Sequence, residues 1–165
     1  MAKHLIYTGV GARKTPENIL VLMKELAVKL DQDGYYLRSG GAKGADSAFE
    51  SGTEKKHVYL AKHANAKAEE IAKQFHPAWD KCSDFAKKLH ARNAFQVLGF
   101  NLDAPSNFLI CWTPDGCFDH ANRTYATGGT GTAISIACRY NVPVFNLKNN
   151  VHFERLNEYV KGGSK

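Results

Sequence analysis

The sequence has 165 residues, 44% of them hydrophobic and 23% charged, and it carries a formal net charge of +6. This length supports one well-buried core and is short for two, so we expect a single globular domain. The positive charge favours anionic partners such as nucleotides or nucleic acid. The longest apolar runs, such as "FLICW" at 108–112, are too short to span a bilayer. We therefore expect a cytoplasmic protein without a membrane partner.

The first third of the chain alternates strand and helix signals. Residues 4–9, "HLIYTG", form a short apolar run that predicts a strand. Thr15 and Pro16 are the predicted N-cap and first-turn residue of a helix over 17–34, where apolar residues recur at helical spacing. The next strand and short helix are predicted over 35–39 and 47–55.

The rest of the chain continues this alternation after a longer helical stretch. A strand over 57–61 is followed by a mostly helical segment over 63–101, which we expect to break near His76 and Pro77. A strand over 108–113 then leads into a polar loop. The remaining predicted elements are the loop over 114–127, a helix after the glycines at 128–131, a strand over 142–147 and a helix over 152–160.

Strands that alternate with helices predict right-handed crossovers and a parallel sheet covered on both faces. The sequence therefore predicts an α/β fold: a single Rossmann-like three-layer domain with a mostly parallel sheet. We expect this domain to cover residues 1–160, with 63–101 as a helical insertion and 161–165 as a flexible tail.

The four cysteines include no C-x-x-C pair, which favours reduced thiols. Cys111, Cys117 and His120 have a conceivable metal-ligand spacing, but a fourth ligand is missing and zinc patterns are usually tighter. We therefore expect no metal site, and no feature of the sequence requires a cofactor.

Three glycine-rich turns each follow a predicted strand and precede a helix. In a parallel sheet such turns gather at the carboxyl ends of the strands, where ligands bind. Their backbone N–H groups, hydroxyls and cations suit a phosphate, with ordinary surface charge as the alternative for Arg13 and Lys43. None of the turns has the P-loop pattern, so ATP hydrolysis is not expected. The candidate phosphate-binding residues are Gly11, Arg13, Ser39, Gly40, Gly41, Lys43, Gly44, Gly128, Gly129, Thr130, Gly131 and Thr132.

The segments "SGGAKGAD" (39–46), "HARNAFQ" (90–96) and "GGTGT" (128–132), in this order, resemble motifs of the SLOG superfamily. This Rossmann-like group includes the DprA DNA-processing proteins and the LOG nucleotide phosphoribohydrolases. The resemblance implies that the third glycine turn binds a nucleotide phosphate and that Arg92 faces the bond between sugar and base. It also suggests a phage or bacterial origin and a homodimer or higher homo-oligomer.

The sequence departs from the LOG pattern at Ser135, where those enzymes have a catalytic glutamate. If glycosidic chemistry is retained, another carboxylate must supply it. Asp46 and Glu50 lie four residues apart on one predicted helix face and are the first candidates. Alternatively, Asp46 only stabilises the N-terminus of its helix through the helix dipole, and Glu50 is solvated. Asp115 and Asp119, in the loop before the third turn, are weaker candidates.

Aromatic side chains near the third turn could hold a base. Trp112 ends a predicted strand there and is the candidate for base stacking, with core packing as the alternative.

Three functions fit these patterns. The first is a nucleotide N-glycosidase that splits a nucleoside monophosphate or related nucleotide. The second is a DprA-like protein that binds or processes single-stranded DNA or DNA with uracil or modified bases. It is favoured by the segment 55–92, which has nine Lys or Arg against four Asp or Glu. The third is a binding protein that sequesters a nucleotide signal without catalysis.

Overall fold

The computed structural model describes residues 5–162 and contains one five-stranded sheet in which every neighbouring pair of strands is parallel. The strand order is β3-β2-β1-β4-β5. This arrangement confirms the predicted α/β, Rossmann-like three-layer fold. The strands are β1 (Ile6–Gly9), β2 (Tyr36–Ser39), β3 (Lys56–Val58), β4 (Phe108–Cys111) and β5 (Val144–Asn146).

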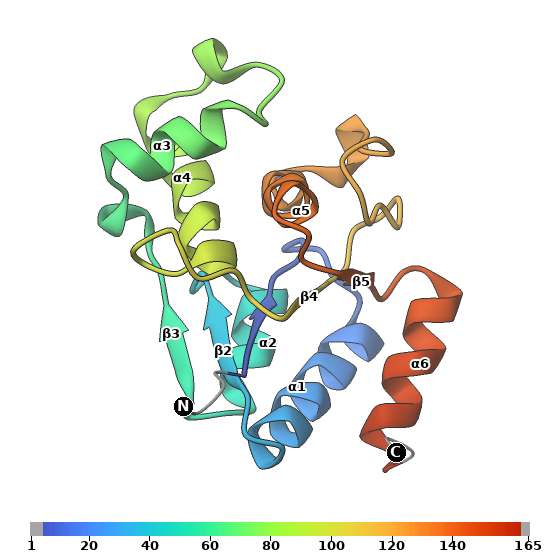
Figure 1. Ribbon diagram of the computed structural model, residues 1–165. Coiled ribbons are helices and arrows are strands. Elements are labelled where there is room, and N and C mark those ends of the chain that lie inside the picture. Colours follow the sequence, from blue (N-terminus) through green and yellow to red (C-terminus); the bar gives the residue numbers. More distant parts are fainter. Residues whose placement is uncertain (1–4, 163–165) are drawn as a thin grey trace.

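Helices cover both faces of the sheet (Figure 1). One hydrophobic core lies between the sheet and α1 (Glu17–Gln32), α2 (Ala45–Ser51) and α6 (Asn150–Val160). The other core lies under α3 (Ala66–Lys73), α4 (Asp84–Leu98) and α5 (Thr130–Arg139). Three short 3-10 helices complete the described elements: η1 (Ala61–His63), η2 (Trp79–Lys81) and η3 (Tyr125–Thr127).

Strand β4 shows how the sequence builds the two cores. Leu109 and Cys111 pack in the core under α4 and α5, whereas Ile110 and Trp112 pack in the core under α1 and α6. Successive side chains of a strand point to opposite faces of the sheet, so a continuous apolar run is needed where both faces are covered. The run "FLICW" therefore belongs to a central strand.

Several predicted boundaries differ from the structure. Thr15 is not the N-cap of α1, because its hydroxyl donates to the carbonyl of Ala12 and Pro16 occupies the cap position. Helix α2 begins at Ala45, two residues before the predicted start, because the glycine turn ends at Gly44 with a φ of +86°. The predicted helix break is confirmed, since α3 ends at Lys73 and α4 begins at Asp84. Residues 163–165 of the predicted tail lie outside the described residues.

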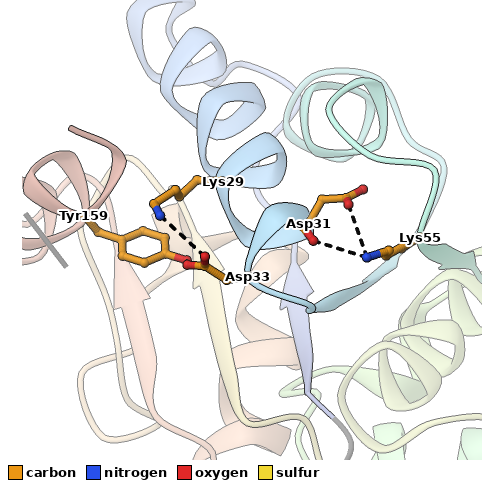
Figure 2. Close-up of polar contacts among 5 residues, drawn as sticks. All are labelled: Lys29, Asp31, Asp33, Lys55 and Tyr159. Atoms are coloured by element: carbon orange, nitrogen blue, oxygen red, sulfur yellow. Dashed lines mark hydrogen bonds and ion pairs between the residues drawn. The ribbon is translucent and has the colours of Figure 1, made fainter. Parts of the chain in front are cut away.

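Side-chain contacts tie the C-terminal end of α1 to α6 and to the residue before β3, near the amino ends of the strands (Figure 2). The phenol of Tyr159 on α6 donates to Asp33, and Lys29 lies 3.4 Å from the same carboxylate. Lys55 contacts Asp31 at 3.4 Å.

In the described part of the chain, none of the helices is both long enough and apolar enough to cross a membrane.

Candidate functional site

A cavity of about 400 Å³ opens at the carboxyl ends of β1 and β4. Strands β1 and β4 are neighbours at the centre of the sheet, and the chain builds outward from them in both directions. This is the topological switch point, the position at which open α/β sheets bind ligands. The cavity is lined by residues 10–14 after β1, Ala42 and Asp46 around α2, residues 126–130 of the third glycine turn, Pro114, and Leu89, His90, Arg92, Asn93 and Gln96 of α4.

The second glycine turn is held by the two carboxylates of α2. Glu50 accepts hydrogen bonds from the Ser39 hydroxyl at 2.6 Å and from the Gly41 N–H at 2.9 Å. Asp46 accepts the Ala42 N–H at 3.1 Å. Glu50 does not line the cavity, because its carboxylate is occupied by the turn. The structure therefore places Glu50 in contact with the turn and outside the cavity lining.

Asp46 is the buried carboxylate of the cavity, with a side chain that is only 4% exposed. Burial raises the pKa of Asp46 to about 6, although the nearby Arg92 guanidinium and the Ala42 N–H favour the charged form. A carboxylate with this pKa is mostly ionised at neutral pH and can still exchange a proton there. These are the properties of a general acid or base.

Arg92 reaches from α4 to the second turn. Its Nη1–H donates to the carbonyl of Gly40 at 2.5 Å, while its buried Nε has no partner among the described residues. A Cβ at Gly40 would lie 2.8 Å from Arg92 Nη1 and 2.9 Å from Asp46 Oδ2. The two charged side chains therefore converge on a glycine that leaves room for both. A guanidinium that lines the cavity is suited to an anionic ligand.

The third glycine turn also contacts α4, through residues of the helix other than Arg92. Asn93 donates to the carbonyl of Gly129 at 3.3 Å, and Thr132 Oγ1 lies 3.0 Å from Nδ1 of His90. Gly128 is exposed, has a φ of +67° and has no atom within 4 Å of its Cβ position. The turn therefore presents open backbone at the N-terminus of α5, where the helix dipole favours an anion.

The structure brings together only part of the predicted site. Seven of the predicted residues line the cavity: Gly11, Arg13, Asp46, Arg92, Gly128, Gly129 and Thr130. The others do not line it: Ser39, Gly40, Gly41, Lys43, Gly44, Glu50, Gly131, Thr132 and Trp112.

Some of these other residues contact the turns that line the cavity, and the rest lie in the core or on the surface. Gly44 allows the first two turns to touch, since a Cβ there would lie 2.9 Å from the carbonyl oxygen of Arg13. Gly131 and Thr132 are buried behind the third turn, where Arg123 packs on Gly131. Lys43 is exposed to solvent. Trp112 is 8% exposed and packs in the core, which is the alternative to base stacking that the sequence left open.

Helix α4 supplies residues that the motif analysis did not assign to the site. His90 and Asn93 are three residues apart and face the third turn, whereas Arg92 and Gln96 are four apart and also line the cavity. The i, i+3 and i+4 spacing of polar residues in the second half of this helix was the available signal.

A second cavity of about 790 Å³ adjoins the first, and both are lined by His90, Gly128 and Gly129. Its wall also contains His120 and Arg123. Both of these side chains contact the buried Ser135 hydroxyl, His120 through Nδ1 at 2.7 Å and Arg123 through Nη1 at 3.0 Å. Ser135 therefore anchors the wall of the second cavity.

The metal spacing noted in the sequence does not form a site. Cys111 is fully buried in the core, Cys117 Sγ lies 3.0 Å from the carbonyl oxygen of Asp119, and His120 is held by Ser135. A different set of residues, His76, Cys82 and His90, brings three potential ligand atoms within 4.8 Å of one another.

Comparison of the chain with protein-family models, curated proteins and solved structures returns no match.

Proposed function

We propose that the protein binds a nucleotide in the cavity at the β1–β4 switch point and hydrolyses its N-glycosidic bond. The observation that carries this proposal is Asp46, a buried carboxylate with a raised pKa, in a cavity formed by glycine turns and Arg92. Carboxylates in such surroundings are typical of acid–base and glycosidic chemistry.

The phosphate of the nucleotide would bind at the third glycine turn. Gly128, Gly129 and Thr130 lie at the N-terminus of α5, and Arg13 extends from the first turn on the same cavity wall. Backbone N–H groups, the positive end of the helix dipole and a guanidinium are complementary to a phosphate. The sugar and base would then extend toward Asp46 and Arg92.

The ionised Asp46 carboxylate would stabilise the positive charge that develops on the sugar as the bond to the base lengthens. Water adds its oxygen to the anomeric carbon, and its proton goes to the departing base. The products are the free base and a sugar phosphate, and no oxidant or reductant is needed. Arg92 acts as a positioning residue, because its charge favours the ionised form of Asp46.

With Asp46 as the catalytic carboxylate, the proposal needs no carboxylate at position 135, where this chain has serine. Ser135 is fully buried, contacts His120 and Arg123, and does not line the cavity that contains Asp46. A carboxylate contributed by α2 would replace the glutamate implied by the LOG resemblance. The resemblance supplies the substrate class, and the cavity supplies the chemistry.

The test is to incubate the purified protein with ribo- and deoxyribonucleoside monophosphates and follow release of the free base. Asp46→Asn should lower kcat by about 10²- to 10⁴-fold and leave nucleotide binding measurable by calorimetry. Asp103→Asn, at an exposed loop position outside the cavity, is the matched control and should retain full activity.

Three other outcomes would contradict the proposal. Tight binding of a nucleotide without any product would indicate sequestration instead of hydrolysis. Retention of single-stranded DNA, with or without uracil, that falls steeply with salt would indicate a nucleic-acid role. Full activity in Asp46→Asn would remove Asp46 from the mechanism.

A further inference from the structure

We propose that His76, Cys82 and His90 form a binding site for one zinc ion, with a coordination position open to the second cavity. The three residues come from different segments: the break after α3, the residue after η2, and α4. Their ligand atoms all lie within 4.8 Å of one another, and all three side chains are partly exposed. This site goes beyond the proposed nucleotide chemistry and does not depend on it.

The two histidines differ in how ready they are to bind a metal. His76 Nδ1 accepts the Ala78 N–H at 3.0 Å, so the ring proton is on Nε2, and a metal on Nε2 requires the tautomer with the proton on Nδ1 and the loss of that hydrogen bond. His90 Nδ1 contacts the Thr132 hydroxyl at 3.0 Å, which leaves its Nε2. Metal-binding histidines usually donate their other ring N–H to an acceptor, as His90 Nδ1 can donate to the Thr132 hydroxyl.

The separation of Cys82 and His76 matches tetrahedral zinc. Cys82 Sγ lies 3.5 Å from His76 Nε2. Zinc bonds to sulfur and nitrogen at their usual lengths, spread at a tetrahedral angle, place those two atoms about 3.6 Å apart. The ligand atom of His90 lies within 4.8 Å of the other two, whereas tetrahedral zinc holds its nitrogen and sulfur ligands about 3.3–3.8 Å apart, so a movement of about 1 Å would complete the site.

The ligand types select the metal and the kind of site. A thiolate with two imidazoles favours zinc and disfavours magnesium or calcium, which prefer oxygen ligands. Three protein ligands leave one tetrahedral position for water or a substrate atom. His76 and His90 both line the second cavity, so that position would face a space large enough for a small molecule. The wall of that cavity also contains Arg123, which suits a ligand with an anionic oxygen.

The test is a titration of tag-free, metal-stripped protein with Co²⁺, a spectroscopic substitute for zinc. The wild type should show a thiolate-to-cobalt charge-transfer band that saturates at one equivalent and is displaced by Zn²⁺. Cys82→Ser and His76→Ala should lose the band. The matched controls are Cys138→Ser at an exposed cysteine and His57→Ala at an exposed histidine, and both should retain it.

A second readout separates loss of the site from loss of the fold. Zn²⁺ should raise the Tm of the wild type and leave the Tm of Cys82→Ser unchanged. Thr132→Val removes the hydroxyl that contacts His90 at similar side-chain volume, and should weaken Zn²⁺ binding by about 10- to 100-fold while the Co²⁺ band remains. Absence of the band in the wild type, its persistence in Cys82→Ser, or its loss in Cys138→Ser would overturn the proposal.

Discussion

The raised pKa of Asp46 makes a direct prediction about stability. Burial disfavours the ionised carboxylate in the folded protein. At a pH above the pKa of Asp46, the folded protein contains this buried negative charge, which lowers the free energy of unfolding. Asp46→Asn removes this charge, retains an oxygen that can accept the Ala42 N–H, and changes the side-chain volume little. The substitution should therefore stabilise the fold at neutral pH.

The size and direction of the effect follow from the two pKa values. Asp46 has a pKa of about 6 in the folded protein against 3.8 for the free group. A shift of this size corresponds to about 3 kcal/mol of unfolding free energy. Because the folded pKa is the higher one, wild-type stability from this group is fully present below about pH 4 and is lost as the pH rises through about 6.

The assay is urea unfolding of the wild type and Asp46→Asn at several pH values. The two proteins should have nearly equal unfolding free energies near pH 4, and the variant should gain about 3 kcal/mol by about pH 8. For a domain of this size that gain corresponds to a Tm increase of about 6–12 °C.

A carboxylate with the opposite shift provides the control. Partial burial raises the pKa of Asp115, but the hydrogen bonds that it accepts from Thr127, Thr124 and Thr113 outweigh this and lower it overall. Asp115→Asn should therefore destabilise the protein at neutral pH, and this loss should shrink as the pH falls through the folded pKa. A stability difference between wild type and Asp46→Asn that does not change with pH would refute the buried-charge reasoning.

Five further substitutions, at four positions, test the contacts of the glycine turns and of the C-terminal helix. Glu50→Ala should lower the unfolding free energy by about 1–3 kcal/mol in urea, and Glu50→Gln by less, because the glutamine oxygen still accepts a turn hydrogen bond. Gly128→Ala should cost about 1–3 kcal/mol from its backbone conformation alone, whereas Gly44→Ala should cost more because its Cβ also meets the Arg13 backbone. Tyr159→Phe should lower the unfolding free energy by about 1 kcal/mol, measured at neutral pH, because it loses the hydrogen bond to Asp33.

The sequence predicted the fold well because its signals are local. Apolar runs such as 108–112, helical spacing over 17–34 and glycine turns between them determine an alternating parallel architecture. Boundaries were less accurate where backbone geometry decides them. The hydroxyl of Thr15 bonds backward to Ala12 instead of capping α1, and this choice depends on the path of the first turn.

The site was predicted only in part because its contacts span long sequence separations. Arg92 bonds to Gly40 and Asn93 bonds to Gly129, and no local pattern reports such pairs. The motif residues Gly128 and Gly129 were found because glycine turns are visible in the sequence. The grouping of His76 with Cys82 was missed, since it forms only when the chain folds back between α3 and α4.

Helix α4 explains why both cavities lie where they do. Arg92 holds the second glycine turn, and Asn93 holds the third, so one helix fixes the distance across the first cavity. His90, on the same helix, contacts Thr132 behind the third turn and lines both cavities. A ligand that moves α4 in one cavity must therefore change the wall of the other. This shared wall follows from a single helix whose polar side chains are spaced to reach two turns.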